Sequence, residues 1–139
     1  MLGTPSGGWP FWGKMSTMER RTRQRDAIWR AFETADRPLS PQEVLAMAQT
    51  DVPGLGIATV YRALSELAQA GRLALVELPG DGVRYEAHGK GHHHHFLCRK
   101  CDRVFDFESC PGKLDLGGPR GFVTESHEII LHGLCADCR

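Results

Sequence analysis

Two Cys-x-x-Cys pairs near the end of the chain are the residues best suited to chemistry. Cys98 and Cys101 form the first pair, and Cys135 and Cys138 form the second. Each pair can present two thiolates from one tight turn, and two such pairs make the tetrahedral four-sulfur set that zinc takes in structural sites. Because the protein would fill all four positions, we expect this zinc to tie a small domain together rather than to catalyse a reaction.

Four consecutive histidines, His92 to His95, lie directly upstream of the first pair. Histidine runs are also purification tags, but tags sit at chain ends and this run is internal. The run therefore indicates further metal binding, although a zinc enzyme with an open histidine site is an alternative. A thiol oxidoreductase that uses Cys98 and Cys101 and a metal-binding adaptor that does not touch DNA are two others. Cys110 is left over, and we expect it to be an ordinary cysteine.

The 139 residues carry 17 basic and 17 acidic side chains, so the formal net charge is zero and gives no general argument for a nucleic-acid partner. Basic residues nevertheless outnumber acidic ones between Lys14 and Arg37, which suits contact with phosphates. The sequence contains no long apolar run and no signal peptide. We therefore expect a cytoplasmic protein without a membrane partner, in which paired cysteines bind metal. Residues 1–17 lack periodicity and are expected to be a flexible extension.

Three helices are predicted in the first half of the chain. Apolar residues recur at helical spacing in residues 18–35 and again in residues 57–70. Between them, Ser-Pro-Gln-Glu at positions 40–43 forms a capping box with proline at the first helical position. This signal predicts a short helix that ends at Ala48.

A β-hairpin is predicted directly after the third helix. Residues 73–78 and 83–87 read as strands on either side of a glycine-rich turn, and a Pro-Gly turn at 51–56 precedes the third helix. Three helices followed by a hairpin in the position of a wing predict a winged helix-turn-helix domain over residues 18–87.

In such a domain the third helix enters the major groove of DNA. Thr59, Tyr61 and Arg62 lie opposite its apolar side, so they are the candidates for contact with thymine methyl groups, base edges and phosphates. Arg23 and Arg25 in the first helix are candidate DNA contacts as well. Each of these residues alone is an ordinary surface side chain, and only the expected fold gives it this role.

A second, smaller domain is expected over residues 92–139, after a hinge at residues 88–91. Residues 96–107 predict a strand pair around the first cysteine pair, and residues 122–131 predict another strand. The stretch 109–121 is rich in glycine and proline, which leaves room for at most one helical turn. The predicted fold class is therefore α+β, with an N-terminal winged helix-turn-helix followed by a small α/β domain that contains the four-cysteine zinc site.

With these motifs in place, the chain resembles the ferric uptake regulator (Fur) superfamily of metal-dependent repressors, from about Met18 to Arg139. The matching stretches are Thr22-x-x-Arg25, Ile57 to Arg62, Tyr85-Glu86, His92 to Cys101 and His132 to Cys138. The resemblance implies a homodimer, joined through its α/β domain, that binds inverted repeats in double-stranded DNA. It also implies a repressor of metal uptake or homeostasis genes, without enzymatic activity and without a small-molecule substrate beyond metal ions.

The resemblance further implies where metals bind. The four cysteines match the family's structural zinc ligands, and a sensory cation site would consist of Glu86, His93, His95 and Asp106. A histidine that completes this site in the family is replaced here by Pro38, whose side chain cannot bind metal, so the coordination number stays open.

A further cation site of the family would use His92, His94 and His127. The glutamate that usually joins them falls in the shortened stretch 109–121, where Asp115 is the candidate.

Metal control of DNA binding follows from the position of the sensory residues. Glu86 lies on the wing side of the hinge and the other three lie beyond it, so a shared cation would fix the angle between the domains and the spacing of the two recognition helices in a dimer. A cation that binds the closed state more tightly shifts the equilibrium towards it. We therefore expect the metal-loaded protein to bind its operator.

The identity of the regulatory metal is less constrained. Nitrogen and oxygen ligands slightly favour Fe(II) or Mn(II) over Zn(II). The terminal sequence His-Gly-Leu-Cys-Ala-Asp-Cys instead resembles the zinc-uptake branch of the family. A peroxide-sensing branch is the other alternative, although it relies on the histidine that Pro38 replaces.

Overall fold

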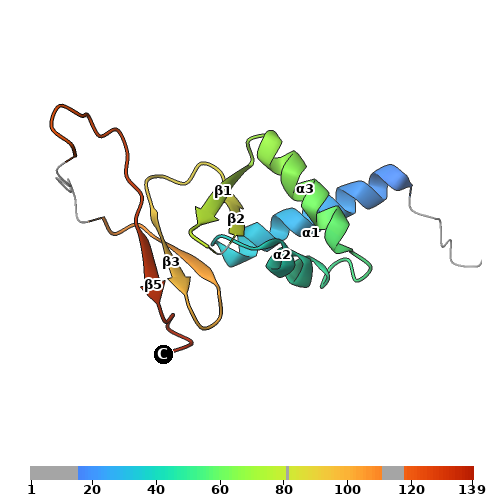
Figure 1. Ribbon diagram of the computed structural model, residues 1–139. Helices are drawn as coiled ribbons and strands as arrows, with labels where there is room; N and C mark the ends of the chain where they lie inside the picture. The colour runs from blue at the N-terminus through green and yellow to red at the C-terminus, as the bar shows by residue number, and fades with distance from the viewer. Residues whose placement is uncertain (1–15, 81, 111–117) are drawn as a thin grey trace, which may run out of the picture.

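The computed structural model of the chain describes residues 16–80, 82–110 and 118–139. Most of the expected N-terminal extension, Asp81 and the candidate ligand Asp115 lie outside these residues. Figure 1 shows three helices at one end, a two-stranded hairpin in the middle and a second sheet at the other end. The predicted α+β class is therefore confirmed.

The helices are α1 (Thr17–Ala35), α2 (Pro41–Ala48) and α3 (Ile57–Gln69). Helix α2 begins behind its capping box as predicted: the Ser40 hydroxyl accepts from the backbone of Glu43, whose carboxylate accepts from the backbone of Ser40. The same reciprocal pair, Ser16 with Glu19, starts α1. Thr17 is therefore helical, and the prediction that the flexible extension reaches residue 17 is wrong at its last position.

An apolar core forms where the three helices meet. Its buried members are Ala27, Ile28, Ala31, Phe32, Leu39, Val44, Ala48, Leu55, Val60, Ala63, Leu64, Leu67 and Leu73. Leu39 exchanges two backbone hydrogen bonds of 2.8 and 2.9 Å with Tyr85, which fastens the hairpin to the helices. This core positions α3 as a rigid element on the surface.

The hairpin consists of β1 (Leu73–Leu78) and β2 (Gly82–Ala87), which are antiparallel with Ala74 opposite Glu86. Successive side chains of a strand face opposite ways. One face of the hairpin therefore carries Val76, Leu78, Arg84 and Glu86, all of them buried. This face looks towards the second sheet rather than towards the helices.

The second sheet has the order β4-β3-β5, made from β3 (His94–Cys98), β4 (Val104–Phe107) and β5 (Ile130–Gly133). Strand β3 is antiparallel to β4 and parallel to β5. The strand pair around the first cysteine pair is as predicted, except that it starts at His94.

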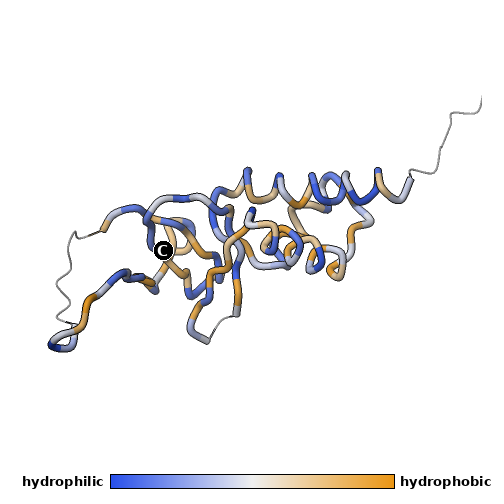
Figure 2. Tube along the Cα trace, turned by 90° about the horizontal axis from the view of Figure 1, so that it is seen from above, coloured by the Kyte–Doolittle hydropathy of each residue, from blue (hydrophilic) through white to orange (hydrophobic). Residues whose placement is uncertain are grey.

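The strand predicted over residues 122–131 is wrong for most of its length. Residues 122–129 form no strand, and Phe122 and Val123 are 74% and 87% exposed. The ladder begins where Ile130 pairs with His95, and among the described residues the alternating pattern upstream meets no partner strand. Figure 2 shows this segment projecting from the end of the elongated molecule opposite the helices.

The hairpin and the second sheet meet through a small apolar cluster of Val76 and Leu78 with Leu97 and Val104. The Arg84 guanidinium also donates to the Asp102 carbonyl at 3.3 Å. The connecting residues 88–91 include Gly89 at φ 93°, a left-handed conformation that favours glycine. Within the described ranges, no helix is long and apolar enough to cross a membrane.

Candidate metal centres and nucleic-acid groove

The histidine run enters β3, so successive histidines face opposite ways. His93 and His95 gather with Glu86 and Asp106 on the face towards the hairpin. His92 and His94 gather with His127 and Cys110 on the other face. In each group, one ligand atom per residue lies within 4.8 Å of all the others. A single stretch of sequence thus supplies two separate clusters.

The four paired cysteines form a third cluster at the end of β3. Cys98 and Cys135 are buried, and the Cys101 and Cys135 sulfurs lie 3.9 Å apart. Four sulfurs held about 2.3 Å from one zinc would stand roughly 3.8 Å from each other in a tetrahedron, so this spacing fits the ion. The cluster therefore suits a structural zinc site.

The ionisation of these thiols also suits a cation. Backbone N–H groups of Cys101 and Cys135 donate to Cys98 and lower the pKa of its thiol to about 6. The guanidinium of Arg103, 3.2 Å from the Cys101 sulfur, lowers the pKa of that thiol. Contact with Cys135, together with burial, raises the pKa of Cys138 to about 12. Four adjacent sulfurs cannot all be thiolates without a compensating charge, and a divalent ion supplies it.

The cluster on the hairpin face is compact and mostly buried. The Nε2 atom of His93 lies 3.0 Å from Oε1 of Glu86, and Nε2 of His95 lies 3.4 Å from both Oε2 of Glu86 and Oδ1 of Asp106. That Oδ1 atom is buried and has no hydrogen-bond partner among the described residues. Two imidazole nitrogens and two carboxylates that converge in this way fit a divalent cation with nitrogen and oxygen ligands.

Charge around this cluster is shared between acids and bases. Burial raises the pKa of the Glu86 carboxyl, but the hydrogen bond from His95 and the nearby His93 outweigh burial and lower it. Burial lowers the pKa of His95, but Glu86 and Asp106 outweigh it and raise the pKa. Burial and the neighbouring Glu86 raise the pKa of Asp106, although its ion pair with Lys90 opposes them. A cation that binds this cluster would therefore have to displace a proton from His95 and the Lys90 ammonium from Asp106.

Two further side chains contact this cluster from outside it. Glu128 Oε1 lies 3.3 Å from Nδ1 of His95, close enough for attraction but not aligned as a hydrogen bond. A carboxylate behind the ring favours a proton on Nδ1 and turns the Nε2 lone pair towards the cluster. Lys90 joins Asp106 to Asp36, whose Oδ1 atom is 3.8 Å from the ammonium. Pro38, two residues after Asp36, is fully buried, and its side chain has no atom that could bind a metal.

The cluster on the opposite face contains the histidines expected for a further site, with Cys110 in addition. His94 is fully buried, and its ring centroid lies 4.6 Å from that of His92 and 5.2 Å from that of His127. The Cys110 sulfur lies 3.4 Å from Nε2 of His127. Asp115, the candidate carboxylate for this site, is outside the described residues.

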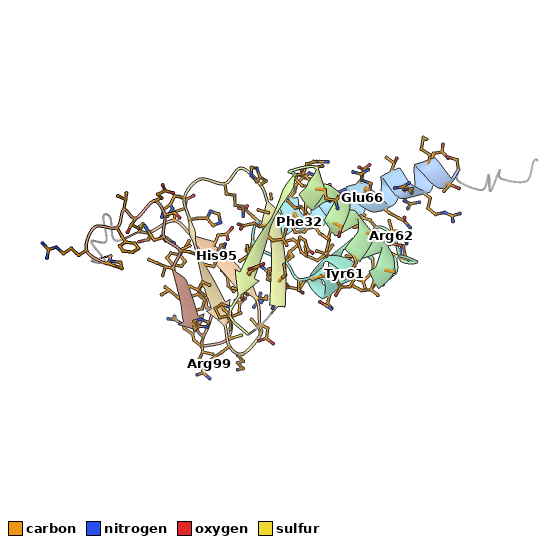
Figure 3. The ribbon with its side chains drawn as sticks, turned by 45° about the horizontal axis from the view of Figure 1, so that its top comes forward. Phe32, Tyr61, Arg62, Glu66, His95 and Arg99 are labelled. Carbon is orange, nitrogen blue, oxygen red and sulfur yellow. The ribbon has the colours of Figure 1, made fainter. Side chains whose placement is uncertain are left out.

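A basic groove of about 450 Å³ runs between α1 and α3. Its lining includes Arg25, Thr59 and Arg62, which were predicted to contact DNA, together with Arg20 and Arg21, which were not. Figure 3 shows Tyr61 and Arg62 on α3, at the end of the molecule away from His95. Tyr61 is 47% exposed.

Arg23 differs from the other predicted DNA-contacting residues. Its guanidinium donates to the Asp51 carbonyl at 3.3 Å and does not line the groove.

Sequence reasoning missed Cys110, Lys90, Glu128 and Arg103. Only Arg103 had a usable signal, because it stands two residues after a cysteine ligand and cations stabilise thiolates. Lys90, Cys110 and Glu128 lie outside the strands and contact residues far from them in the sequence, so no local pattern could identify them.

Comparison with known proteins agrees with this geometry. The sequence profile described as "Ferric uptake regulator family" matches residues 17–132. The ferric uptake regulation protein of Bordetella parapertussis is 33% identical over 125 residues, which cover 86% of this chain and 89% of that protein.

Two solved structures share the fold and more than a quarter of the sequence. The ferric uptake regulator of Francisella tularensis with iron has a TM-score of 0.65 and 31% identity, and the match covers 83% of this chain and 90% of that one. A zinc-bound manganese uptake regulator has a TM-score of 0.69 and 28% identity, with coverages of 81% and 87%. This chain therefore belongs to the ferric uptake regulator family of metal-responsive transcriptional regulators.

Proposed function

We propose that this chain is a homodimeric repressor that binds inverted repeats in DNA when Glu86, His93, His95 and Asp106 hold a divalent cation. The observation that supports the proposal is that these four ligands come from two different parts of the fold. Glu86 belongs to the hairpin attached to the helices, whereas His95 and Asp106 belong to the second sheet and His93 directly precedes its strand β3. The winged-helix domain is residues 18–87, the hinge is 88–91 and the dimerisation domain is 92–139.

Glu86 is the residue that connects metal binding to the angle between the domains. Without a cation, the domains are joined by a small apolar cluster and a few polar contacts, so the angle can change at low cost. When all four ligands hold one ion, the angle is fixed. About 5.5 kcal/mol of preference for the closed state is enough to change its population from 1:99 to 99:1.

DNA recognition is assigned to α3, whose Thr59 and Arg62 line the groove and whose Tyr61 is exposed. Thr59, Tyr61 and Arg62 enter the major groove, and Arg25 on α1 contacts the phosphates beside it. Two copies in a dimer would read half-sites about one helical turn, roughly 34 Å, apart or at a related spacing. Because Arg23 contacts the Asp51 carbonyl, we assign it a smaller contribution than Arg25.

The ligand set slightly favours Fe(II) or Mn(II) over Zn(II) at the regulatory site, because two carboxylates and two imidazoles include no soft donor. A zinc-responsive regulator and a peroxide sensor are the alternatives. Titration with each metal, followed by hydrogen peroxide on the iron-loaded protein, separates the three. The protein is assigned to the cytoplasm, where its DNA target lies, and is not an enzyme.

The proposal is tested by DNA binding with and without metal. Inverted-repeat duplexes are first selected from a random pool with metal-loaded protein, and affinity is then measured by fluorescence anisotropy. Glu86→Gln removes the carboxylate charge that spans the hinge, so it should weaken metal-dependent binding by at least about tenfold, as changes around metal ligands do. Glu77→Gln, on the same hairpin but exposed, is the matched control and should bind like the unchanged protein.

Two results would contradict the proposal. One is equal affinity for the selected DNA in the presence of the metal and after a chelator has removed it. The other is metal-dependent binding by Glu86→Gln that matches Glu77→Gln.

A further inference from the structure

The cluster on the face of β3 opposite Glu86 is completed by a cysteine. We propose that the Cys110 thiolate is a metal ligand, and that together with His92, His94 and His127 it forms a three-nitrogen, one-sulfur zinc site. This site is distinct from the four-cysteine cluster and from the Glu86 cluster. The proposal does not depend on the repressor function, because it concerns only metal binding by the Cys110 cluster and not DNA binding.

Distances within the cluster fit a tetrahedral ion. The Cys110 sulfur and Nε2 of His127 are 3.4 Å apart. A sulfur about 2.3 Å and a nitrogen about 2.0 Å from one zinc would lie roughly 3.5 Å from each other. One ligand atom from each of the four residues falls within 4.8 Å of the other three, so the remaining positions need little movement.

His94 gives an independent reason to place an ion here. Its ring is fully buried, and its Nε2 atom has no hydrogen-bond partner among the described residues. A buried polar nitrogen without a partner costs free energy, which coordination would recover. The Ile129 backbone N–H donates to Nδ1 at 3.2 Å. A neutral ring that binds an ion through Nε2 carries its proton on Nδ1, so this contact must lengthen when the ion binds.

The donor atoms determine which ion this cluster prefers. Thiolate is a soft ligand that suits zinc, whereas iron(II) and manganese(II) are better served by oxygen. The Glu86 cluster has two carboxylates and no sulfur, while the Cys110 cluster has one sulfur and no carboxylate. The two faces of one strand therefore select different ions, which lets the chain hold zinc on one face without blocking the response on the other.

The site also anchors a segment whose described residues have no strand pairing of their own. Cys110 follows β4, and His127 precedes β5. Between His127 and residue 118 the chain forms no strand and exposes Phe122 and Val123. A zinc ion bound by both Cys110 and His127 fixes the two ends of this excursion to His92 and His94 beside the central strand.

Cobalt(II) spectroscopy tests the sulfur ligand directly. Full-length protein that retains one zinc per chain in its four-cysteine site is cleared of other metals and titrated with cobalt(II). Released zinc is counted with a chromogenic chelator, so that only cobalt bound without displacing zinc is considered. This cobalt should give a near-ultraviolet sulfur-to-cobalt charge-transfer band in the unchanged protein. Cys110→Ser should lose that band and bind zinc at least about tenfold more weakly at this site, because even changes behind a ligand cost that much.

Two further variants keep the test clear. His127→Ala should weaken zinc binding at this site in the same way, whereas His132→Ala, an exposed histidine on β5, should not. A Cys110→Ser protein that is folded, retains its structural zinc and still shows the full charge-transfer band overturns the proposal. Zinc binding by Cys110→Ser as tight as by His132→Ala overturns it equally. The repressor proposal is unaffected by either result, since its test is DNA binding through Glu86.

Discussion

The two halves of the molecule are held together by different forces. In the first half, three helices and the start of the hairpin surround a continuous apolar core. In the second half, the only described buried apolar cluster is small and borrows Val76 and Leu78 from the hairpin. Its other buried contacts are groups of cysteine, histidine and carboxylate. One half gains its stability by removing apolar surface from water, whereas the other contains clusters of ligand residues that bound ions would stabilise.

This difference teaches how sensing and reading can be separated within one short chain. The helical half, to which we assign DNA binding, is built on an apolar core that includes no residue of the three metal-ligand clusters. The other half, to which we assign metal sensing, has only a small described apolar cluster, so we expect bound ions to add to its stability. A domain of this size with a full apolar core would be folded with or without metal, so metal binding would change its structure little.

Removing a cysteine ligand is the strongest way to sharpen the comparison. Cys135→Ser should lose the structural zinc and unfold the second half, because zinc binding in small domains is worth about 10–16 kcal/mol. The α1–α3 core should stay folded. Two-dimensional amide NMR, together with zinc analysis, reports on both halves at once. His132→Ala, an exposed position on β5 that leaves every cysteine intact, is the control, and loss of the helical resonances in Cys135→Ser would show that the halves are not independent.

A cavity in the first core gives the converse effect. Leu64 is fully buried, so Leu64→Ala should lower the free energy of unfolding of the helical half by about 2–5 kcal/mol. The second half should retain its zinc at the same stoichiometry. Leu75→Ala, which truncates a leucine that is 52% exposed, should change stability by no more than about 0.5 kcal/mol. Urea unfolding followed by circular dichroism measures both, and equal effects of the two substitutions would argue against a single dominant core.

A smaller change tests the local signals that shape the first half. Ser40→Ala removes the hydroxyl that caps α2 and should cost about 1 kcal/mol of stability. Ser65→Ala, on an exposed position of α3, should be close to neutral. The same urea titrations apply, and a neutral Ser40→Ala would mean that packing alone sets the start of α2.

The smallest effect distinguishes the two faces of β3 in metal-free protein. The carboxylates of Glu86 and Asp106 raise the pKa of His95, so its ring should titrate above the ordinary value of 6.5. Burial lowers the pKa of His94, which should titrate below 6.5. The stability gained through His95 is therefore present at low pH and lost as pH rises past its folded pKa, whereas that gained through His94 is lost on acidification. Ring proton NMR across the pH range measures both midpoints, and a reversed order would refute the assignment of the two environments.

Much of the first half could be predicted because its signals are local. The capping box and proline fixed the start of α2, and apolar spacing identified the buried faces of α1 and α3. The capping box at Ser16 was equally local and was overlooked. Motif spacing predicted the four-cysteine cluster, and the family resemblance implied the residues of the Glu86 cluster.

The second half resisted prediction because its structure depends on long-range pairing. The alternation in residues 122–131 suggested a strand, but β3 offers a partner only from His95 onward. Cys110 had no sequence neighbour to mark it, and only the sheet brings it to His127. Contacts of this kind are set by register between strands that lie far apart in the chain, which no short window contains.

The histidine run that enters β3 does not by itself specify the register of this strand. After a slip of one residue, three of the four positions would still hold a histidine, yet every histidine would face the opposite way and the two clusters would exchange their histidines. What forbids the slip lies outside the run: it would push Leu97 out of its apolar contacts and pull Cys98 away from its sulfur partners. The four-cysteine cluster thus sets the register of β3. A change of register would give each histidine cluster a different set of partners, so it would alter which ion is bound.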